Sequence, residues 1–394
     1  MINMKNISIF LEKIISYYFS FPDFNQSMII IALLIILISI LFSKYFLSNN
    51  SKYTSKENND IFSLMKNTPI LCIKSLSKLT GYNIYAKCEY FNYYTSKDRI
   101  IKRILLDALS KRKINKDTNI YLASNGLSAY SMISICQILG LSNLIIVIPD
   151  SCPENIIKKI RKTNAKLIIT KNVDFNNFSE NYIRLCSKIS SEDENSFFIN
   201  LYQNELNMIT NFEEIASEFY SQLNNKIDSF ICCANTGGTI SGFSNYLKLK
   251  NKNCIIALSD IENSGMNSYI KEGVFFKEEI KGENKFINNN YGKGNGFLNN
   301  NIRKANIDEC YLCKEEEIFF MIDYLKKNDG INIGFNEGLN IVGILKMIKD
   351  KKNILKKNDN IATIFFDDGT YDCDKVKEYN IESNINIKNI NDIF

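Results

Sequence analysis

A lysine stands at a predicted junction between a strand and a helix, a position that favours imine chemistry. The segment Cys88–Arg99 reads CEYFNYYTSKDR, and its apolar and aromatic start predicts the end of a strand. After Lys97, residues 100–109 carry apolar side chains at helical spacing. The N-terminus of a helix disfavours a cation, so Lys97 is suited to act as a neutral amine that forms a Schiff base. The alternative is an ordinary solvated surface lysine.

A glycine-rich turn stands at a second predicted junction, far along the chain. Residues 232–243 read CCANTGGTISGF, and they follow an apolar run typical of a buried strand and precede a helical pattern. Glycines let backbone N–H groups approach an anion, and the N-terminus of the next helix adds partial positive charge. A phosphate cradle together with an imine-forming lysine points to pyridoxal phosphate (PLP) as the cofactor.

Four motifs, in order and spacing, resemble those of the PLP-dependent cysteine synthase and cystathionine β-synthase family, which has the tryptophan-synthase-β-like fold (type II). The family's opening GNTPLVRL is similar to KNTPIL at 66–71, and its KExxNPGGSxKDR is similar to residues 87–99. Its VIPE…GAELV.T resembles residues 147–170, and its GTGGTISG resembles NTGGTISG at 235–242. The resemblance extends over residues 62–372, and it implies PLP as the cofactor and a homodimer as the assembly.

The resemblance also implies a role for each matching residue. The lysine would hold PLP as an internal aldimine and later remove the α-proton of the bound amino acid. The Thr-Gly-Gly-Thr turn would bind the phosphate, and the loop after a predicted strand at 119–124 would bind the substrate carboxylate and the phenolic oxygen of the cofactor. The implied cofactor-binding residues are Lys97, Thr236, Gly237, Gly238, Thr239, Asn125 and, at the pyridine nitrogen, Asp368; the implied substrate-binding residues are Ser124, Asn125 and Ser128.

Several departures from the family's motifs lie in the same loops. Tyr93 and Tyr94 replace small residues, and one residue is missing before Lys97, which predicts a displacement of the lysine by about 3 Å, the rise of one extended residue. Leu127 stands where the family has a threonine, and Glu337 adds a carboxylate near the expected amino-acid site. The family's GIGxG loop is retained as GKGNG at 292–296.

The function implied by the resemblance is that of a cysteine synthase (O-acetylserine thiol-lyase type), and an apolar run at 28–47 predicts that the enzyme is membrane-anchored. Such an enzyme replaces the β-substituent of O-acetylserine or serine with sulfide or a thiol, through an aminoacrylate. The departures leave an alternative open, a catalytically degenerate member that serves as a PLP-binding or scaffolding protein. A serine/threonine dehydratase is a lesser alternative, because NTPILCIKSL and NTGGTISG are closer to the synthases.

Strand-like and helical segments alternate between residues 119 and 170, which predicts βαβ units with parallel strands. The predicted fold class is therefore α/β. The resemblance implies two open parallel-sheet α/β domains with PLP in the cleft between them, and a transmembrane helix is predicted before them. Composition predicts an N-terminal segment 1–27, a transmembrane helix 28–47, a linker 48–61 and a flexible tail 373–394. The resemblance implies a large PLP-binding domain 62–98 plus 204–372 and a small domain 99–203.

The run MIIIALLIILISILFSKYFL at 28–47 is long and apolar enough to cross a bilayer once. A buried core helix is the alternative, and a cleavable signal peptide fits less well because no small-residue cleavage site follows the run. Lysines lie on both sides of the span, with a small excess after it, which favours a cytosolic catalytic domain.

Composition excludes several other kinds of chemistry. The 394-residue chain has no histidine, which excludes Ser-His-Asp and Cys-His catalysis and removes the commonest zinc ligand. Its 11 cysteines all follow the predicted span, and their odd number suits a reducing compartment. The CxxC pattern at 310–313 has no partner pair, so no metal site is expected. A net charge of +5 gives no case for nucleic acid, and the expected partners are the membrane and small amino-acid and thiol or sulfide substrates.

Overall fold

The computed structural model describes residues 61–171, 181–261, 264–275, 298–370 and 389–393. The predicted transmembrane span 28–47 and the glycine-rich loop 292–296 lie outside the described residues. Among the helices that are described, none combines the length and apolar character needed to cross a membrane. From Leu64 on, the described elements belong to one structural unit, residues 64–394.

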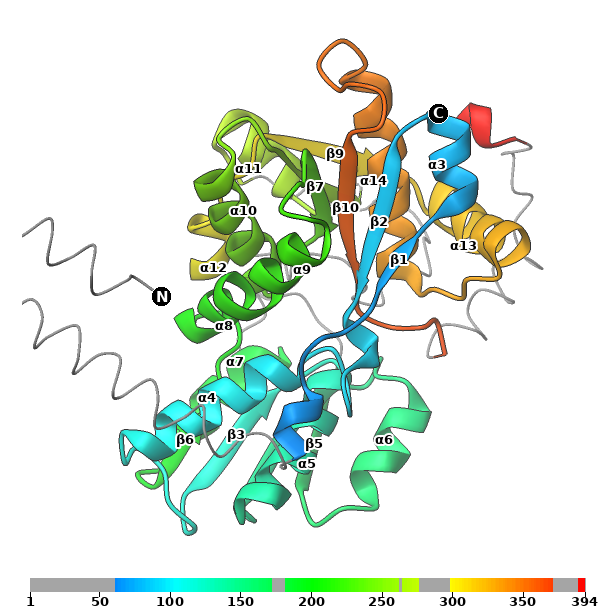
Figure 1. Ribbon diagram of the computed structural model, residues 1–394. Coiled ribbons are helices and arrows are strands. Elements are labelled where there is room, and N and C mark those ends of the chain that lie inside the picture. Colours follow the sequence, from blue (N-terminus) through cyan, green and yellow to red (C-terminus); the bar gives the residue numbers. More distant parts are fainter. Residues whose placement is uncertain (1–60, 172–180, 262–263, 276–297, 371–388, 394) are drawn as a thin grey trace, which may run out of the picture. The chain divides into compact units, whose positions relative to one another are not determined.

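The larger of the two sheets has six strands in the order β1-β2-β10-β7-β8-β9. All neighbouring strands run parallel except β1, which pairs antiparallel with β2. The strand that comes last in the sequence, β10, lies between β2 and β7 (Figure 1), so the sheet joins segments from both ends of the unit. The strands are β1 (Ile70–Cys72), β2 (Asn83–Cys88), β7 (Ser229–Cys233), β8 (Ile255–Ile261), β9 (Glu309–Cys313) and β10 (Asn360–Phe365).

Helices cover both faces of the large sheet, and the strand side chains alternate between two cores. Ile231 and Cys233 of β7 pack with α3, α13 and α14, whereas Phe230 and Cys232 pack with α9, α10, α11 and α12. This period of two is what an extended strand imposes. The helices are α3 (Lys74–Thr80), α8 (Glu205–Thr210), η4 (Asn211–Ala216), α9 (Ser217–Gln222), α10 (Gly238–Lys250), α11 (Met266–Glu272), α12 (Asn300–Arg303), α13 (Glu315–Asp329) and α14 (Phe335–Asp350).

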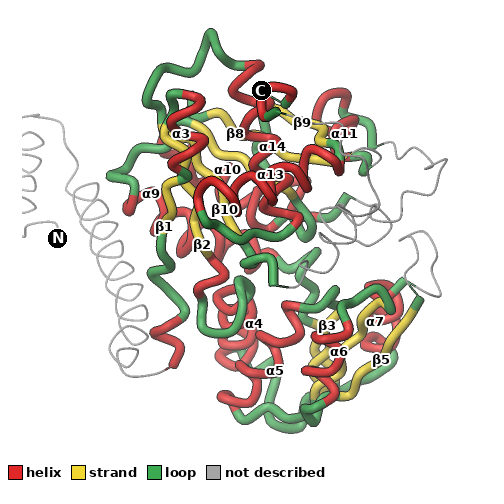
Figure 2. Tube along the Cα trace, turned by 90° about the vertical axis from the view of Figure 1, so that its right-hand side faces the viewer, coloured by secondary structure: helices red, strands yellow, loops and turns green. Residues whose placement is uncertain are grey.

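The smaller sheet has four parallel strands in the order β5-β4-β3-β6. Tyr121 and Val147 pack against α7 on one face, and the alternate residues Leu122 and Ile146 are also buried. Helices α4 and α5 pack against each other beside this sheet (Figure 2). The elements are α4 (Asp98–Ser110), β3 (Asn119–Ala123), α5 (Leu127–Leu139), β4 (Leu144–Pro149), α6 (Glu154–Arg161), β5 (Lys166–Thr170), α7 (Tyr182–Ser191) and β6 (Ser196–Phe198).

The predicted α/β class with parallel sheets is confirmed, with β1 as the antiparallel exception. The alternation predicted between residues 119 and 170 is the succession β3, α5, β4, α6, β5. Within the tail 373–394, Ile390 and Ile393 are buried in the core that contains α13 and α14. Three short helices complete the described elements: η2 (Ile61–Leu64), η3 (Glu89–Phe91) and η6 (Ile390–Asp392).

Candidate active site

A cavity lies where the carboxyl ends of strands from the two sheets meet. Strand β3 of the small sheet and strands β7 and β10 of the large sheet end at this cavity, and α4 begins there. The carboxyl ends of strands are where open α/β sheets bind their ligands. Residues from each of these junctions line the cavity, among them Lys97, Ser124, Asn125, Ser128, Thr236, Gly237, Thr239, Asn336, Phe366 and Asp367.

Lys97 is the N-cap residue of α4, and its side chain lines the cavity. The Lys97 Nζ lies 5.0 Å from the centroid of the Phe366 ring. Burial of the ammonium lowers the pKa of Lys97, and the nearby Cys233 and Glu89 offset only part of that effect. More of this side chain is therefore the neutral amine, which is the form that attacks a carbonyl carbon.

Hydrogen bonds to Asp98 fix the shortened loop before Lys97. The Asp98 carboxylate accepts from the backbone N–H groups of Tyr94, at 2.7 Å, and Thr95, at 3.0 Å. It also accepts from the hydroxyl of Ser131 on α5, at 2.6 Å. The hydroxyl of Thr95 in turn accepts from the Lys97 N–H at 3.0 Å. Lys97 lines the cavity with the shortened loop before it, and the displacement of about 3 Å stays a prediction.

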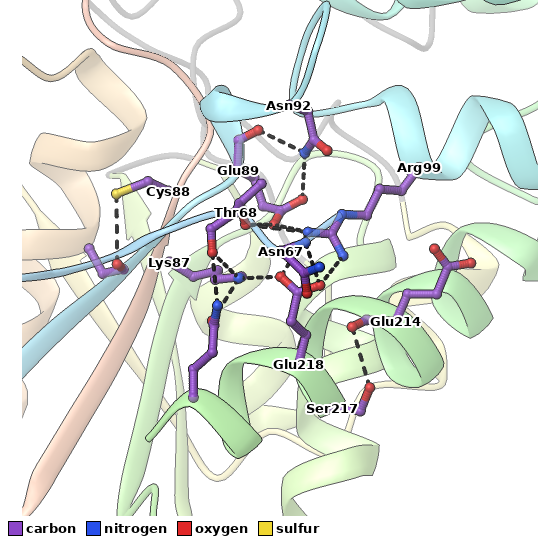
Figure 3. A network of polar contacts seen from close by, with 12 residues as sticks. Asn67, Thr68, Lys87, Cys88, Glu89, Asn92, Arg99, Glu214, Ser217 and Glu218 are labelled. Carbon is purple, nitrogen blue, oxygen red and sulfur yellow. Dashed lines mark hydrogen bonds and ion pairs between the residues drawn. The ribbon is translucent and has the colours of Figure 1, made fainter. Parts of the chain in front are cut away.

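Arg99, two residues after the lysine, enters a buried network of charges (Figure 3). Its guanidinium donates to the Glu218 carboxylate through both terminal nitrogens, at 2.9 and 3.0 Å, and to Glu89 at 3.1 Å. Glu218 also pairs with Lys87 of β2. Arg99 and Lys87 are both fully buried. The network connects α4, β2 and α9, so it fixes the start of α4 against the large sheet.

Glu218 is the shared carboxylate of this network, and its pKa reflects that position. Burial alone would raise the pKa of Glu218, but the hydrogen bonds and charges of Arg99 and Lys87 outweigh burial and lower it to about 2. Burial lowers the pKa of Lys87, and its hydrogen bond to Glu218 offsets part of that effect. Glu218 is therefore ionised at neutral pH and compensates the buried cations beside it.

The Thr-Gly-Gly-Thr turn connects β7 to α10 at the cavity. Thr236, Gly237 and Thr239 line the cavity, and Gly238 is the first residue of α10. Gly237 has a φ of 76°, in the left-handed region that favours glycine. A Cβ at Gly237 would lie 2.8 Å from the backbone nitrogen of Ile302. The turn thus presents the N–H groups and the positive end of a 13-residue helix to the cavity.

The loop between β3 and α5 forms another part of the wall. Ser124, Asn125, Leu127 and Ser128 all line the cavity. The Ser124 hydroxyl accepts the N–H of Gly126 at 2.9 Å, so it stabilises the loop itself. Leu127 brings no side-chain donor, but the N–H groups in the first turn of a helix have no intrahelical acceptor. Asn125 and Ser128 add an amide and a hydroxyl beside this second helix N-terminus.

The segment after β10 places Asp367, and not Asp368, in the lining of the cavity. Asp368 is exposed, and its carboxylate accepts from the backbone N–H and the hydroxyl of Thr370, at 3.0 and 2.5 Å. The turn between these residues therefore holds Asp368 outside the lining. The position of Asp368 gives no support to its predicted contact with a pyridine nitrogen.

Glu337 was expected to bring a carboxylate to the amino-acid site, and the structure places it elsewhere. It is fully buried, and its Oε1 accepts from the backbone N–H of Phe366 at 2.8 Å. Its neighbour Asn336 lines the cavity instead. Glu337 therefore supports the end of β10 from behind the cavity wall.

Three further residues of the lining, Tyr202, Asn336 and Phe366, were not assigned to the site from the sequence. Phe366 directly follows β10, so the rule that ligands bind at the carboxyl ends of strands could have identified it. Asn336 lies at the start of α14, in the segment that the resemblance already placed near the amino-acid site through its neighbour Glu337.

Comparison with known proteins agrees with this geometry. The sequence pattern of the family described as pyridoxal-phosphate dependent enzymes matches residues 61–367. The chain belongs to this family. A cysteine synthase of Dictyostelium discoideum is 31% identical over 323 residues, which cover 81% of this chain and 84% of that relative. Within this family, the chain is similar to the cysteine synthases and the cystathionine β-synthases.

Two other relatives are similar over most of their length. Cysteine synthase B of Campylobacter jejuni is 29% identical over 308 residues, which cover 77% of this chain and 96% of that relative. The crystal structure of a hydrogen sulfide-producing enzyme from Fusobacterium nucleatum matches with a TM-score of 0.66 and 25% sequence identity. That match covers 79% of this chain and 99% of the other.

The cavity of this family member fits the cofactor of the family. An amine with a lowered pKa and a helix N-terminus line the same cavity, as the carbonyl and the phosphate of PLP require. The left-handed φ of Gly237 and the contact with Ile302 that a Cβ would make explain why this turn of the cavity wall carries a glycine. Lys97 would carry PLP, and the turn 236–239 would hold its phosphate. Among the described residues, no three His, Cys, Asp or Glu side chains are grouped to hold a metal ion.

Proposed function

We propose that the chain catalyses β-replacement on O-acetylserine or serine, with sulfide or a thiol as the incoming nucleophile. The observation that carries the proposal is one cavity lined by Lys97 and by the N-termini of two helices, α5 and α10. The similarity to two cysteine synthases supports this class of substrate.

Lys97 has two tasks in the proposed reaction. Bound PLP would supply an electron sink for negative charge at the α-carbon of the amino acid. Lys97 would carry the cofactor before the substrate binds, and its Nζ would then accept the proton from the α-carbon. The lowered pKa of Lys97 suits both tasks, because each one needs the neutral amine.

The two helix N-termini would orient the substrate. The first turn of α10 would hold the phosphate, and the first turn of α5, with Asn125 and Ser128, would bind the α-carboxylate. With PLP held by its phosphate and the amino acid held by its α-carboxylate, rotation of the substrate would be limited, and its α-proton would be presented to Lys97.

Two alternative functions follow from the same residues. A degenerate, PLP-binding member is favoured by Leu127, which gives the substrate loop one side-chain donor fewer. It is disfavoured by the buried hydrogen bonds of Asp98, which keep Lys97 at the cavity despite the shortened loop. A serine/threonine dehydratase would use the same lysine and phosphate turn, and the product distinguishes it.

Product analysis of the full-length chain, purified with PLP, tests the proposal. We expect cysteine from O-acetylserine or serine with sulfide, and none from Lys97→Ala. Lys188→Ala is the matched control, because the Lys188 side chain is 72% exposed, and it should retain activity. Pyruvate as the main product would indicate a dehydratase. A protein that binds PLP but forms neither product would indicate the degenerate alternative.

We also propose that residues 28–47 anchor the chain in a membrane. The support is the length and apolar character of this run in the sequence. All 11 cysteines follow this run, and their odd number suits a reducing compartment, which agrees with a cytosolic catalytic domain.

A further inference from the structure

A hydroxyl group next to Lys97 is buried without a hydrogen-bond partner. Ser96 is 3% exposed. Its Oγ has no partner within the described part of the chain. A buried polar group in this state is unfavourable, and in a folded protein it calls for an explanation such as a bound group. The Ser96 hydroxyl is therefore a buried hydrogen-bond donor that is not used by the described residues.

The unpaired hydroxyl belongs to the wall of the cavity. Ser96 lines the cavity together with Lys97, Thr236, Gly237 and Thr239. Among the described residues that line this cavity, it alone has a buried side-chain polar atom that lacks a partner. The polar atom thus lies where the family's cofactor would bind.

Hydroxyls at nearby positions differ from Ser96 because they have partners within the protein. Thr95, one residue earlier, bonds to the Ser131 hydroxyl and accepts the N–H of Lys97. Ser124 accepts the N–H of Gly126. The hydroxyls of Thr95 and Ser124 hold the loops together, whereas the Ser96 hydroxyl stabilises nothing that the structure describes.

We propose that the Ser96 hydroxyl donates a hydrogen bond to bound PLP. Lys97 would carry the cofactor, and Ser96 is its neighbour in the sequence and in the cavity wall, so the Ser96 hydroxyl would lie close to bound PLP. PLP offers phosphate and phenolic oxygens as acceptors, and a serine hydroxyl rotates to meet an acceptor. The inference goes beyond the proposed reaction, because it requires only that PLP binds in this cavity.

Titration of the apo protein with PLP tests this role. We expect Ser96→Ala to bind PLP about tenfold more weakly than the wild type, the loss that corresponds to about 1.4 kcal/mol for one hydrogen bond. The melting temperature of apo Ser96→Ala should equal or exceed that of the apo wild type, because the substitution removes an unpaired buried hydroxyl. A purely structural role would instead lower the stability of the apo protein.

Ser229→Ala is the matched control. The Ser229 hydroxyl is also buried and unpaired, but it lies at the amino end of β7, outside the lining of the cavity. This variant should bind PLP as tightly as the wild type. Ser96→Thr, which retains a hydroxyl, should recover affinity relative to Ser96→Ala.

Two outcomes would overturn the inference: an unchanged PLP affinity in Ser96→Ala, or a loss of affinity matched by an equal loss in Ser229→Ala. The wild type in the same titration separates this inference from the proposed function. If the wild type binds no PLP, both the proposed function and the role of Ser96 are wrong. If the wild type and Ser96→Ala bind PLP with equal affinity, only the role of Ser96 is wrong.

Discussion

Two effects disfavour the charged form of Lys97: its position at the start of a helix and its burial in the fold. The N-terminus of α4 disfavours an ammonium ion, and burial disfavours it further. The first effect is visible in the sequence, because a polar segment precedes a helical pattern. The second depends on the tertiary fold, which also brings the ring of Phe366, distant in the sequence, to 5.0 Å from the Lys97 Nζ, measured to the ring centroid.

We expect the Lys97 amine of the apo protein to titrate below pH 10.5, the ordinary pKa of lysine. Burial disfavours the charged form, so the neutral amine is populated at a lower pH. Competitive labelling with acetic anhydride over a range of pH, read by mass spectrometry of the Lys97 peptide, measures the midpoint. Exposed lysines of the same protein provide the internal reference. A midpoint at or above pH 10.5 would contradict this description of the site.

Other site residues show where reasoning from the sequence reaches its limit. The Thr-Gly-Gly-Thr turn was predicted as a cradle, and the structure places Thr236, Gly237 and Thr239 in the lining. The choice between Asp367 and Asp368 was not predictable, because it depends on a turn that ends in a hydrogen bond to Thr370.

At the scale of elements, the charge network secures the start of α4. Arg99 of α4 meets Glu218 of α9, 119 residues later in the sequence. Lys87 of β2 meets the same carboxylate. Buried charges that lose one partner are strongly destabilising, because the other charge stays in a medium that solvates it poorly. The network therefore helps to fix α4, the helix that begins directly after Lys97.

We expect Glu218→Gln to lower the free energy of unfolding at pH 7 by about 3–5 kcal/mol, since it leaves the buried Lys87 without its carboxylate and Arg99 with Glu89 alone. Folding lowers the pKa of Glu218 from 4.5 to about 2, so its stabilisation is present above pH 4.5 and is lost as the pH falls toward about 2. The difference between wild type and variant should shrink over that range. Denaturant titrations at several pH values measure both effects.

Glu213→Gln is the control for this prediction. Glu213 precedes Glu218 in the same helical run, but its side chain is 52% exposed and it pairs with the half-exposed Arg103. Its removal should change the unfolding free energy by less than about 1 kcal/mol. Equal costs for the two substitutions would show that the buried network has no special importance.

The elements of the small sheet were more predictable than their counterparts in the large one. From β3 to β5, strands and helices follow one another in the sequence, and each has the expected spacing of apolar residues. In the large sheet, β10 lies between β2 and β7, which are far from it in the sequence. Local patterns carry no information about such pairings, so neither the sheet order nor the partner of Arg99 could be read from the sequence.

At the scale of the whole molecule, the chain combines a cavity built from two sheets with an apolar run near its start. We expect the full-length protein to stay in the membrane pellet after alkaline extraction, because we propose that residues 28–47 form a membrane anchor. Deletion of residues 28–47 should release the protein into the supernatant. A full-length protein that is extracted as readily as the deletion variant would contradict the anchor.

The central claim is that Lys97 and the turn 236–239 hold PLP in one cavity. The visible absorbance of the purified full-length protein tests it most directly, recorded for the wild type, Lys97→Ala and the control Lys188→Ala. We predict a visible cofactor band in the wild type and the control, no such band in Lys97→Ala, and a spectral shift on addition of O-acetylserine to the wild type. A wild type without the band after incubation with PLP, or a Lys97→Ala variant that retains it, would contradict the account.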